Sequence, residues 1–506
     1  MNSSFHLKIK KETLSKKNQD LFHKMYDDYV YKELHRTPFF RSTRKQSKKL
    51  GVVLVTHGNN GTFVRQAIES FLNFLPCIST ESLYFVVYVN ESKDRITLNL
   101  QNQFPSIHFV YIENQKEHGG LTGAWNKGID LCFANGCESI ILSNDDIFIL
   151  PNIEHLLEQL ETVTEDQLLY FGPVTNNPGC DNLCQYSLQA KSEDPKLTFN
   201  EKHQKKWNLN GFFMAFPKHV LIKNKFDSEH YFDPSFPFGN NETEWYHRLQ
   251  LLGGDAVVVP RTFVYHYKLK SWRNTKEKQP QCLYTCVLGG YENSIYISNA
   301  KNMNYDVYFY TDCLSFVQEC VLQDIKPMLV FHYDNPKLKQ RHIKSNPMTY
   351  LPSFIKESIW IDGNILFLET TYDIYENRSE EIVCYAHPDR NCIGTEIEKT
   401  LQLGLINKEM KYKMSKIYKK YNFDPYLHKV LTETCILYRK HNKSIKDFGE
   451  AWFKLIQICP RDQLSFDFLT KYENVSVKQL PFDERPVIKL QHDNPHTRFQ
   501  NDMKNS

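Results

Sequence analysis

From residue 51 onward, short apolar runs rich in β-branched residues alternate with stretches of helical periodicity, and this alternation restricts the chain to few folds. The pattern predicts strands at 52–56, 83–89, 108–112 and 139–142, with helices at 63–75 and 121–134. Such alternation implies right-handed βαβ units and a largely parallel sheet. Because ligands of these sheets bind beyond the carboxyl ends of the strands, we expect the site at that edge.

A polar stretch at residues 270–281 separates this pattern from a second one. Further strands are predicted at 282–288, 306–310 and 358–361, followed by helices at 396–421 and 445–458. The length of 506 residues leaves room for two such domains. We therefore predict an α/β chain with a basic helical arm and two domains, with the bounds 1–49, 50–275 and 282–500.

The charge is unevenly distributed. The whole chain has 62 Lys and Arg against 59 Asp and Glu, a formal charge of +3, whereas residues 1–50 alone contain 13 basic and 5 acidic residues. The small net charge of the whole chain argues against a nucleic-acid-binding protein. The remainder is slightly acidic, so any anion must be bound by a few local groups.

The cysteines and the hydropathy pattern favour a cytoplasmic protein without a membrane span. The 13 cysteines form no CxxC pair, so we interpret them as reduced thiols rather than zinc ligands or a disulfide framework. Residues 1–11 lack the apolar core of a signal peptide, and no run of about 18 apolar residues is present.

A group of polar motifs follows the predicted strands of the first domain. Asn144, Asp145 and Asp146 come directly after one strand, where a carboxylate pair is costly to bury unless a cation or hydrogen-bond donors meet it. Taken alone, such a pair is more often a turn or a helix cap. A Gly-rich stretch at 119–128 precedes it, and the motifs at 210–216, 238–248 and 264–266 follow.

In this order, the motifs resemble the family 2 glycosyltransferases of the GT-A fold over residues 51–275. The resemblance implies that Asp146 binds Mg²⁺ or Mn²⁺ together with His266, while Asp145 and Gly211 lie near the nucleotide-sugar donor. The residues implied to border the base and ribose are Thr56, His57, Asn90 and Glu91, and those implied to lie against the nucleoside sugar are Gly119, Gly120 and Asn126. Asn90 and Asn144 replace acidic residues that are usual in the family.

The resemblance also implies a general base. When Arg248 is matched to the family's arginine, the base falls on Glu242, with Glu244 as the second choice. Arg248 is then expected near the donor, and Trp245 and Phe212 as walls of the acceptor site.

The second domain has its own ordered motifs, at 284–292, 310–312, 358–364, 386–396 and 461–466. They resemble a glycosyltransferase-like family of plant proteins linked to cell-wall mucilage and turgor, related in layout to family 8. The resemblance implies a second GT-A-like domain, in which Asp362 and Asn364 take the place of a metal-binding Asp-x-Asp element.

Further roles in the second domain follow from the same resemblance. Asp462 and Gln463 would face the donor sugar, with Asp462 a candidate catalytic residue, while Arg341 and Lys344 would approach the phosphates. Arg341 and Lys344 belong to a basic run at residues 339–344, which a solvated helix face explains equally well. Thr285, Gly289 and His387 complete the implied donor site, and His492 or His496 could add a metal ligand.

We therefore expect a two-domain glycosyltransferase that uses Mn²⁺ or Mg²⁺ and a nucleotide sugar, with UDP-sugars ahead of GDP- or dTDP-sugars. Its acceptor would be a glycan or a protein- or lipid-linked hydroxyl group. Three alternatives remain: one catalytic domain with a degenerate acceptor-binding partner, a non-catalytic carbohydrate-binding protein, and lipid-amide hydrolysis by the second domain. The last lacks an HExxH or GxSxG element.

Overall fold

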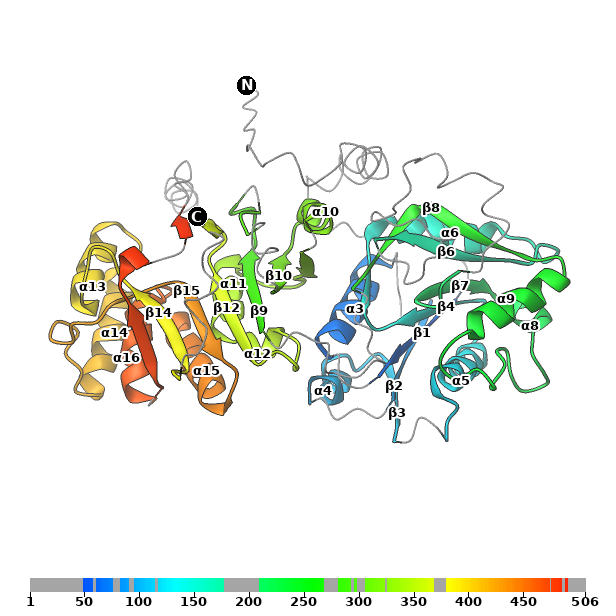
Figure 1. The fold of residues 1–506 in the computed structure, drawn as a ribbon, viewed down its shortest axis with the longest axis horizontal. Coiled ribbons are helices and arrows are strands. Elements are labelled where there is room, and N and C mark those ends of the chain that lie inside the picture. The colour runs from blue at the N-terminus through cyan, green and yellow to red at the C-terminus, as the bar shows by residue number, and fades with distance from the viewer. Residues whose placement is uncertain are drawn as a thin grey trace, which may run out of the picture. The chain divides into compact units, whose positions relative to one another are not determined.

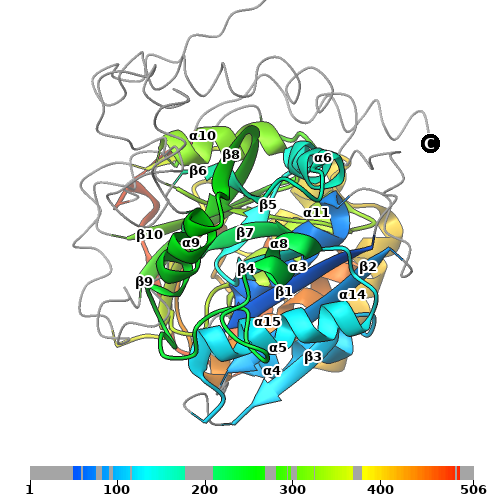
Figure 2. The same ribbon diagram turned by 90° about the vertical axis from the view of Figure 1, so that its right-hand side faces the viewer.

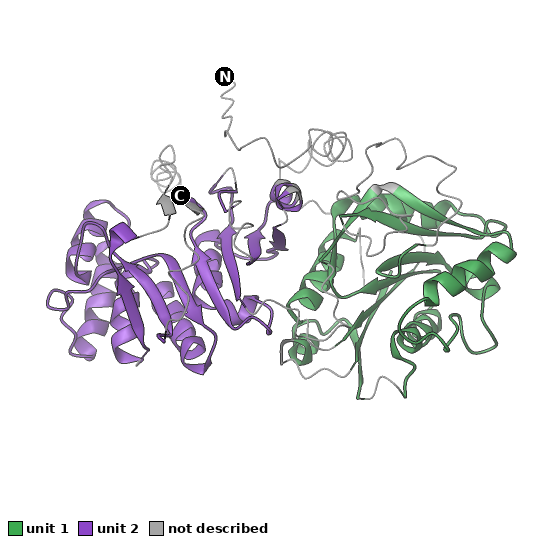
Figure 3. Cartoon of the chain, in the orientation of Figure 1, with its two compact units in different colours: residues 1–274 green, residues 275–506 purple. Residues whose placement is uncertain are grey.

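The computed structural model divides the chain into two compact units, residues 1–274 and 275–506 (Figure 3). It describes residues 49–57, 61–75, 82–90, 95–113, 117–176, 209–267, 281–292, 295–297, 305–323, 325–367, 379–473, 475–484 and 487–489. The predicted arm, apart from its last residue, and most of the predicted linker lie outside these ranges.

Unit 1 contains one sheet with helices on both faces. Its elements are β1 (Leu50–Thr56), α3 (Gly61–Phe74), β2 (Leu83–Asn90), α4 (Arg95–Gln103), β3 (His108–Ile112), α5 (Gly120–Ala134), β4 (Ser139–Asn144), β5 (Ile147–Ile149), η1 (Pro151–Ile153), α6 (Glu154–Thr162), β6 (Leu169–Thr175), β7 (Phe213–Pro217), α8 (Lys218–Lys223), α9 (Asn241–Leu251) and β8 (Asp255–His266).

The strand order in unit 1 is β3-β2-β1-β4-β7-β6-β8-β5. The first four strands are parallel, and β4 pairs antiparallel with β7. Helices α3 and α4 lie on one side of β1 and β2 and α5 on the other, and the turned view shows α5, α8 and α9 in front of the sheet (Figures 1 and 2). The parallel strands therefore end together at one edge, as the sequence predicts.

Unit 2 is built in the same way. Its elements are β9 (Gln281–Val287), β10 (Asp306–Thr311), α10 (Leu314–Leu322), β11 (Lys326–Leu329), α11 (Pro336–Ser345), α12 (Pro347–Tyr350), β12 (Glu357–Ile361), β13 (Ile365–Phe367), β14 (Ile382–Ala386), α13 (Ile393–Gln402), α14 (Lys408–Lys420), β15 (Thr432–Lys440), α15 (Lys443–Ile458), α16 (Gln463–Tyr472), β16 (Val477–Leu480), η6 (Phe482–Glu484) and β17 (Val487–Lys489).

The two sheets share one topology. The order in unit 2 is β11-β10-β9-β12-β15-β14-β16, which repeats the unit 1 order strand for strand up to β8. The short strand that follows the acidic motif is β5 in unit 1 and β13 in unit 2, and each pairs antiparallel with a late strand. Both units are therefore α/β domains whose motifs occupy equivalent places.

The predicted strands and helices of both units are confirmed within about two residues, except for one long helix. The predicted helix at 396–421 is two helices, because Gly404 adopts a positive φ of 69° and Asn407 caps the start of α14 by accepting from the Met410 N–H. The cysteines that the structure describes are free. None of the described helices has the length and apolarity that crossing a membrane requires.

Candidate functional site

Two carboxylates stand at the end of β4 in unit 1 and have different partners. The Thr56 hydroxyl, at the end of the neighbouring β1, donates a 2.6 Å hydrogen bond to Asp145 Oδ2. Asp146 Oδ1 lies 3.4 Å from His266 Nε2, and both side chains are buried. The Asp-Asp pair is thus neither a turn nor a cap alone, since each carboxylate has its own buried partner.

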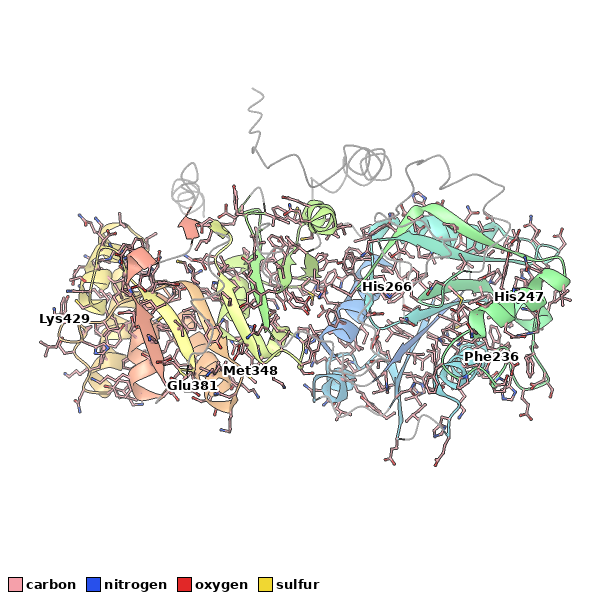
Figure 4. The ribbon with its side chains drawn as sticks, in the orientation of Figure 1. Phe236, His247, His266, Met348, Glu381 and Lys429 are labelled. Atoms are coloured by element: carbon pink, nitrogen blue, oxygen red, sulfur yellow. The ribbon has the colours of Figure 1, made fainter. Side chains whose placement is uncertain are left out.

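Strand pairing explains why His266 reaches Asp146. Residue 266 is the last residue of β8 and pairs antiparallel with Ile147, and the next backbone N–H donates to the Asp146 carbonyl. Figure 4 labels His266 at this end of β8. Its ring stacks on Phe212 with centroids 4.7 Å apart, and Asn176 binds its backbone N–H and carbonyl. The imidazole therefore contacts Phe212 and Asp146, while Asn176 fixes the backbone of His266.

Glu242 lies at the start of α9, next to Gly211. A Cβ atom on Gly211 would be 3.6 Å from the Glu242 carboxyl carbon, so the two residues are in close contact. Burial raises the pKa of Glu242, while hydrogen bonds from the backbone N–H groups of Glu242 and Gly211 partly oppose the rise. Since Gly211 adjoins Phe212, the Glu242 carboxyl and the His266 ring contact consecutive residues of one segment.

Glu244 is engaged elsewhere. Its two carboxylate oxygens accept from Arg248 Nε at 2.5 Å and Arg248 Nη2 at 3.1 Å, one turn later in α9. The same guanidinium donates to the backbone carbonyls of Asn224 and Tyr231. These bonds hold α9 against the loop between α8 and α9, residues 224–240. They occupy the guanidinium group of Arg248, which was expected near the donor, and the carboxylate of Glu244, which was the second choice for the base.

The Gly-rich turn before α5 also packs against the 224–240 loop. Gly119 and Gly120 have φ values of 75° and 62°, and a Cβ on Gly120 would come within 2.6 Å of the Pro237 carbonyl. The Asn126 amide accepts from the N–H groups of Tyr231 and Phe232 and donates to the Phe232 carbonyl. Asn126 thus supports the loop through its polar atoms, rather than leaving them for a nucleoside.

The other expected contacts of unit 1 have mixed outcomes. Buried His57 Nδ1 and Asn90 Oδ1, at the ends of β1 and β2, have no hydrogen-bond partner within the described ranges. Glu91 lies outside those ranges. The prediction that Trp245 is an acceptor wall is wrong, because its ring is fully buried among Tyr170, Phe216 and Phe232.

In unit 2, the ammonium group of Lys344 lies between two carboxylates. Lys344 Nζ is 2.6 Å from Asp462 Oδ2 and 3.3 Å from Asp362 Oδ1, and it also donates to Thr434 Oγ1 at 3.3 Å. Trp360 Nε1 donates to the same Asp362 oxygen at 2.8 Å. Burial alone would raise the pKa of Asp462, but Lys344 and nearby arginines outweigh it and hold that pKa far below its usual value.

A basic face of α11 continues this cluster. Lys337, Arg341 and Lys344 recur at the spacing of one helix face, and Arg341 Nη2 lies 3.9 Å from Asp462 Oδ1. Burial, together with Arg341 and Arg461, lowers the pKa of Lys337 to about 8. The run is thus not a solvated face. Lys337 was not among the residues expected to approach the phosphates, although its helical spacing from Arg341 and Lys344 was a usable signal.

A buried carboxylate positions Arg461 beside this cluster. Fully buried Glu396 accepts from Arg461 Nε at 3.0 Å and Nη2 at 2.9 Å on one oxygen, and from Arg390 Nε on the other. Arg390 Nη2 lies 2.8 Å from His387 Nε2, and two backbone N–H groups donate to His387 Nδ1. His387 therefore belongs to this supporting network.

The remaining expected residues of unit 2 have simpler surroundings. Gly289, with a φ of 66°, donates its N–H to Asp312 Oδ2 at 2.9 Å. The buried atoms Thr285 Oγ1 and Gln463 Oε1 have no partner in the part of the chain that the structure describes. Asn364 lies in the turn before β13, and His492 and His496 fall outside the described residues.

Comparison with sequence families agrees with this division. The model of glycosyl transferase family 2 matches residues 52–229, and that of the TOD1/MUCI70 glycosyltransferase-like domain matches residues 349–487. With the two sheet orders, these matches make the chain two GT-A-like domains in tandem. No curated protein sequence matches the chain.

The chain has low similarity to three solved structures, among others. They are GalNAc-T7 with UDP, GalNAc and Mn²⁺ (15% identity, 46% of this chain and 46% of that one, TM-score 0.34), the mannosyltransferase PcManGT of Pyrobaculum calidifontis with GDP-Man and Mn²⁺ (14%, 50% and 68%, 0.34), and S. aureus TarS 1–349 (12%, 44% and 62%, 0.31). The chain thus spans less than half of the GalNAc-T7 chain.

Proposed function

We propose that the chain is a glycosyltransferase whose unit 1 transfers a sugar from a nucleotide-sugar donor to a hydroxyl group, with inversion at the anomeric carbon. One observation carries the proposal: the buried Glu242 carboxyl contacts Gly211, and the adjacent Phe212 stacks on His266 beside Asp146. The proposed base, Glu242, and the proposed cation site, formed by Asp146 and His266, thereby lie at the same edge of the sheet.

Asp146 and His266 suit a divalent metal. A carboxylate oxygen and an imidazole nitrogen are ordinary ligands of Mn²⁺, and their 3.4 Å separation lets both approach one ion. No group of three or more His, Cys, Asp or Glu ligands occurs in the described ranges, so water and donor phosphate oxygens would complete the coordination. The bound ion would supply Lewis-acid stabilisation of the departing diphosphate.

Glu242 is proposed as the general base. In a single displacement, the acceptor oxygen bonds to the anomeric carbon, the bond from that carbon to the diphosphate breaks, and the acceptor proton passes to the Glu242 carboxylate. Burial raises the pKa of Glu242, which strengthens it as a proton acceptor. Glu244 suits this role less, because Arg248 holds both of its oxygens.

The donor is proposed to be a UDP-sugar, with GDP- and dTDP-sugars as alternatives. His57 and Asn90 offer buried polar atoms at the strand ends where the resemblance to family 2 implies the base, and Thr56 donates a hydrogen bond to Asp145 nearby. The acceptor is a glycan or a protein- or lipid-linked hydroxyl group.

Unit 2 is proposed to bind a nucleotide sugar as well, since its family match and sheet order are those of a glycosyltransferase-like domain. One observation favours the alternative that it is degenerate and binds the acceptor. Asp462, the candidate catalytic residue, is ion-paired with Lys344 and has a depressed pKa, so it is a poor proton acceptor.

A donor screen tests the proposal. The full chain is incubated with UDP-, GDP- and dTDP-sugars and Mn²⁺, and nucleotide release is measured for the wild type, Asp146→Asn and Asp362→Asn. We expect turnover of one donor class that Asp146→Asn abolishes. If no sugar nucleotide is bound or turned over, the glycosyltransferase proposal fails.

A further inference from the structure

The two units differ at the position of the proposed metal site. The backbone N–H of Asn144 donates to the Phe212 carbonyl and that of Asp362 to the Cys435 carbonyl, both at 2.9 Å. Asn144 and Asp362 therefore occupy equivalent places at the carboxyl ends of β4 and β12. Two residues later, unit 1 has Asp146 and unit 2 has Asn364. Unit 2 therefore has an amide at the position where unit 1 has the carboxylate that contacts His266.

The position of His266 also differs between the units. His266 pairs with Ile147, the first residue of β5, and Lys489 pairs with Ile365, the first residue of β13. By this register, residue 489, a lysine in the sequence, holds the backbone position in unit 2 that residue 266 holds in unit 1. The described residues of unit 2 therefore do not fit the metal that the sequence resemblance implies at Asp362.

A cation of the protein itself is present instead. The Lys344 ammonium group lies within 3.3 Å of Asp362 and Asp462, and its side chain is only 3% exposed. Its three donors point to Asp362, Thr434 and Asp462, so it contributes a fixed buried charge. A metal ion between these two carboxylates would first have to displace the ammonium group.

Further cationic side chains lie around Lys344. Arg341 Nε is buried and has no hydrogen-bond partner in the described part of the chain, and Arg341 meets Asp462 only at 3.9 Å. Glu396 holds Arg461 next to Asp462, and Lys337 lies on the same helix face as Arg341. Several cationic donors thus converge at the carboxyl edge of the sheet.

We propose that unit 2 binds the diphosphate of a nucleotide without a divalent metal, through Lys337, Arg341 and Arg461, with the Lys344 ammonium group in the place of the ion. A diphosphate matches a row of cationic donors in charge and length, and Arg forms the strongest such contacts. The inference rests on the proposed nucleotide-sugar binding by unit 2 and adds how the diphosphate charge is met.

Binding of UDP to the full chain tests the inference, with Asp146→Asn as the background and EDTA present. We expect calorimetry to detect UDP binding that inorganic pyrophosphate competes away and that Arg341→Met weakens about tenfold or more. Lys339→Met removes the same charge from the same helix outside the Lys337 face and should change the affinity little.

Lys344 is tested by the double variant Lys344→Met with Asp462→Asn, which avoids a buried unpaired carboxylate, and by Lys344→Arg, which keeps the charge. We expect the EDTA-resistant binding to be lost in the first and retained in part in the second. Mn²⁺ titration followed by electron paramagnetic resonance should show a site that Asp146→Asn removes and Asp362→Asn leaves intact.

Two results would overturn the inference, and they are distinguishable. UDP binding that requires Mn²⁺ and disappears in Asp362→Asn would show that unit 2 binds nucleotide through a metal, leaving the proposed function of unit 2 in place. An absence of any UDP binding that responds to the Arg341, Lys344 or Asp362 variants would remove both the inference and the nucleotide site of unit 2.

Discussion

His266 Nε2 lies 3.4 Å from Asp146 Oδ1, although 120 residues separate them along the chain. The two side chains meet because β5, which starts directly after Asp146, pairs antiparallel with the end of β8. The pairing of two strands thus builds the proposed cation site from a carboxylate and an imidazole that are both buried.

Asp146→Asn should remove most of the Mn²⁺ affinity and the metal-dependent activity of unit 1. The amide is nearly isosteric but carries no charge, and loss of a direct ligand should exceed the roughly 10- to 100-fold effect of losing an outer-shell partner. The measurement is kcat/KM against Mn²⁺ concentration. Asp166→Asn, an exposed change in the turn after α6, serves as the control, and equal metal dependence in both variants would refute the assignment.

Glu396→Gln should destabilise unit 2. Glu396 is fully buried between Arg390 and Arg461, and removing its charge leaves two guanidinium groups without their shared partner. Breaking a buried ion pair costs about 3 kcal/mol or more, and the partial exposure of both arginines favours the lower figure.

Urea unfolding of Glu396→Gln measures this loss. Glu398→Gln lies on the same helix and breaks an exposed pair with Lys411, so its effect on the free energy of unfolding should be small. Similar losses in the two variants would show that the buried network contributes nothing special to stability.

Glu292 should make unit 2 less stable as the pH rises toward neutrality. Burial, with repulsion from Asp362, raises the pKa of Glu292 from 4.5 to about 7. Between these values the folded state binds more protons than the unfolded state, so this stabilising contribution is present below about pH 4.5 and is lost as the pH passes 7.

Thermal unfolding of Glu292→Gln checks the sign. The variant should melt above the wild type at pH 8, and the difference should shrink as the pH is lowered toward 5. Glu409→Gln, at an exposed position of α14, is the control. A variant that melts lower than the wild type at pH 8 would contradict the raised pKa.

The sequence predicted the local parts of this molecule well. Continuous apolar runs located β1 to β4 and their counterparts β9, β10 and β12, because most of these strands are buried on both faces. The position of Asp145 and Asp146 at a strand end followed from the same pattern. The helix break at Gly404 was missed, because apolar spacing on both sides of it remains helical.

Contacts between distant segments were harder to predict. Asn126 was expected at the nucleoside, but its partners are backbone groups at 231 and 232, more than 100 residues away. Lys344 could equally have been a solvated cation, since Asp462 lies 118 residues further on. A sequence motif thus identifies candidate functional residues, but their contacts depend on segments that are distant in the sequence.

The central claim, that unit 1 transfers sugar with Glu242 as base, is tested most directly by comparing Glu242→Gln with Glu244→Gln. Single-turnover transfer from the donor that the screen identifies, at saturating Mn²⁺, measures the chemical step. Glu242→Gln should slow it about 10² to 10⁴-fold while donor binding persists, and Glu244→Gln should chiefly lower thermal stability by releasing Arg248. Full transfer by Glu242→Gln would contradict the account.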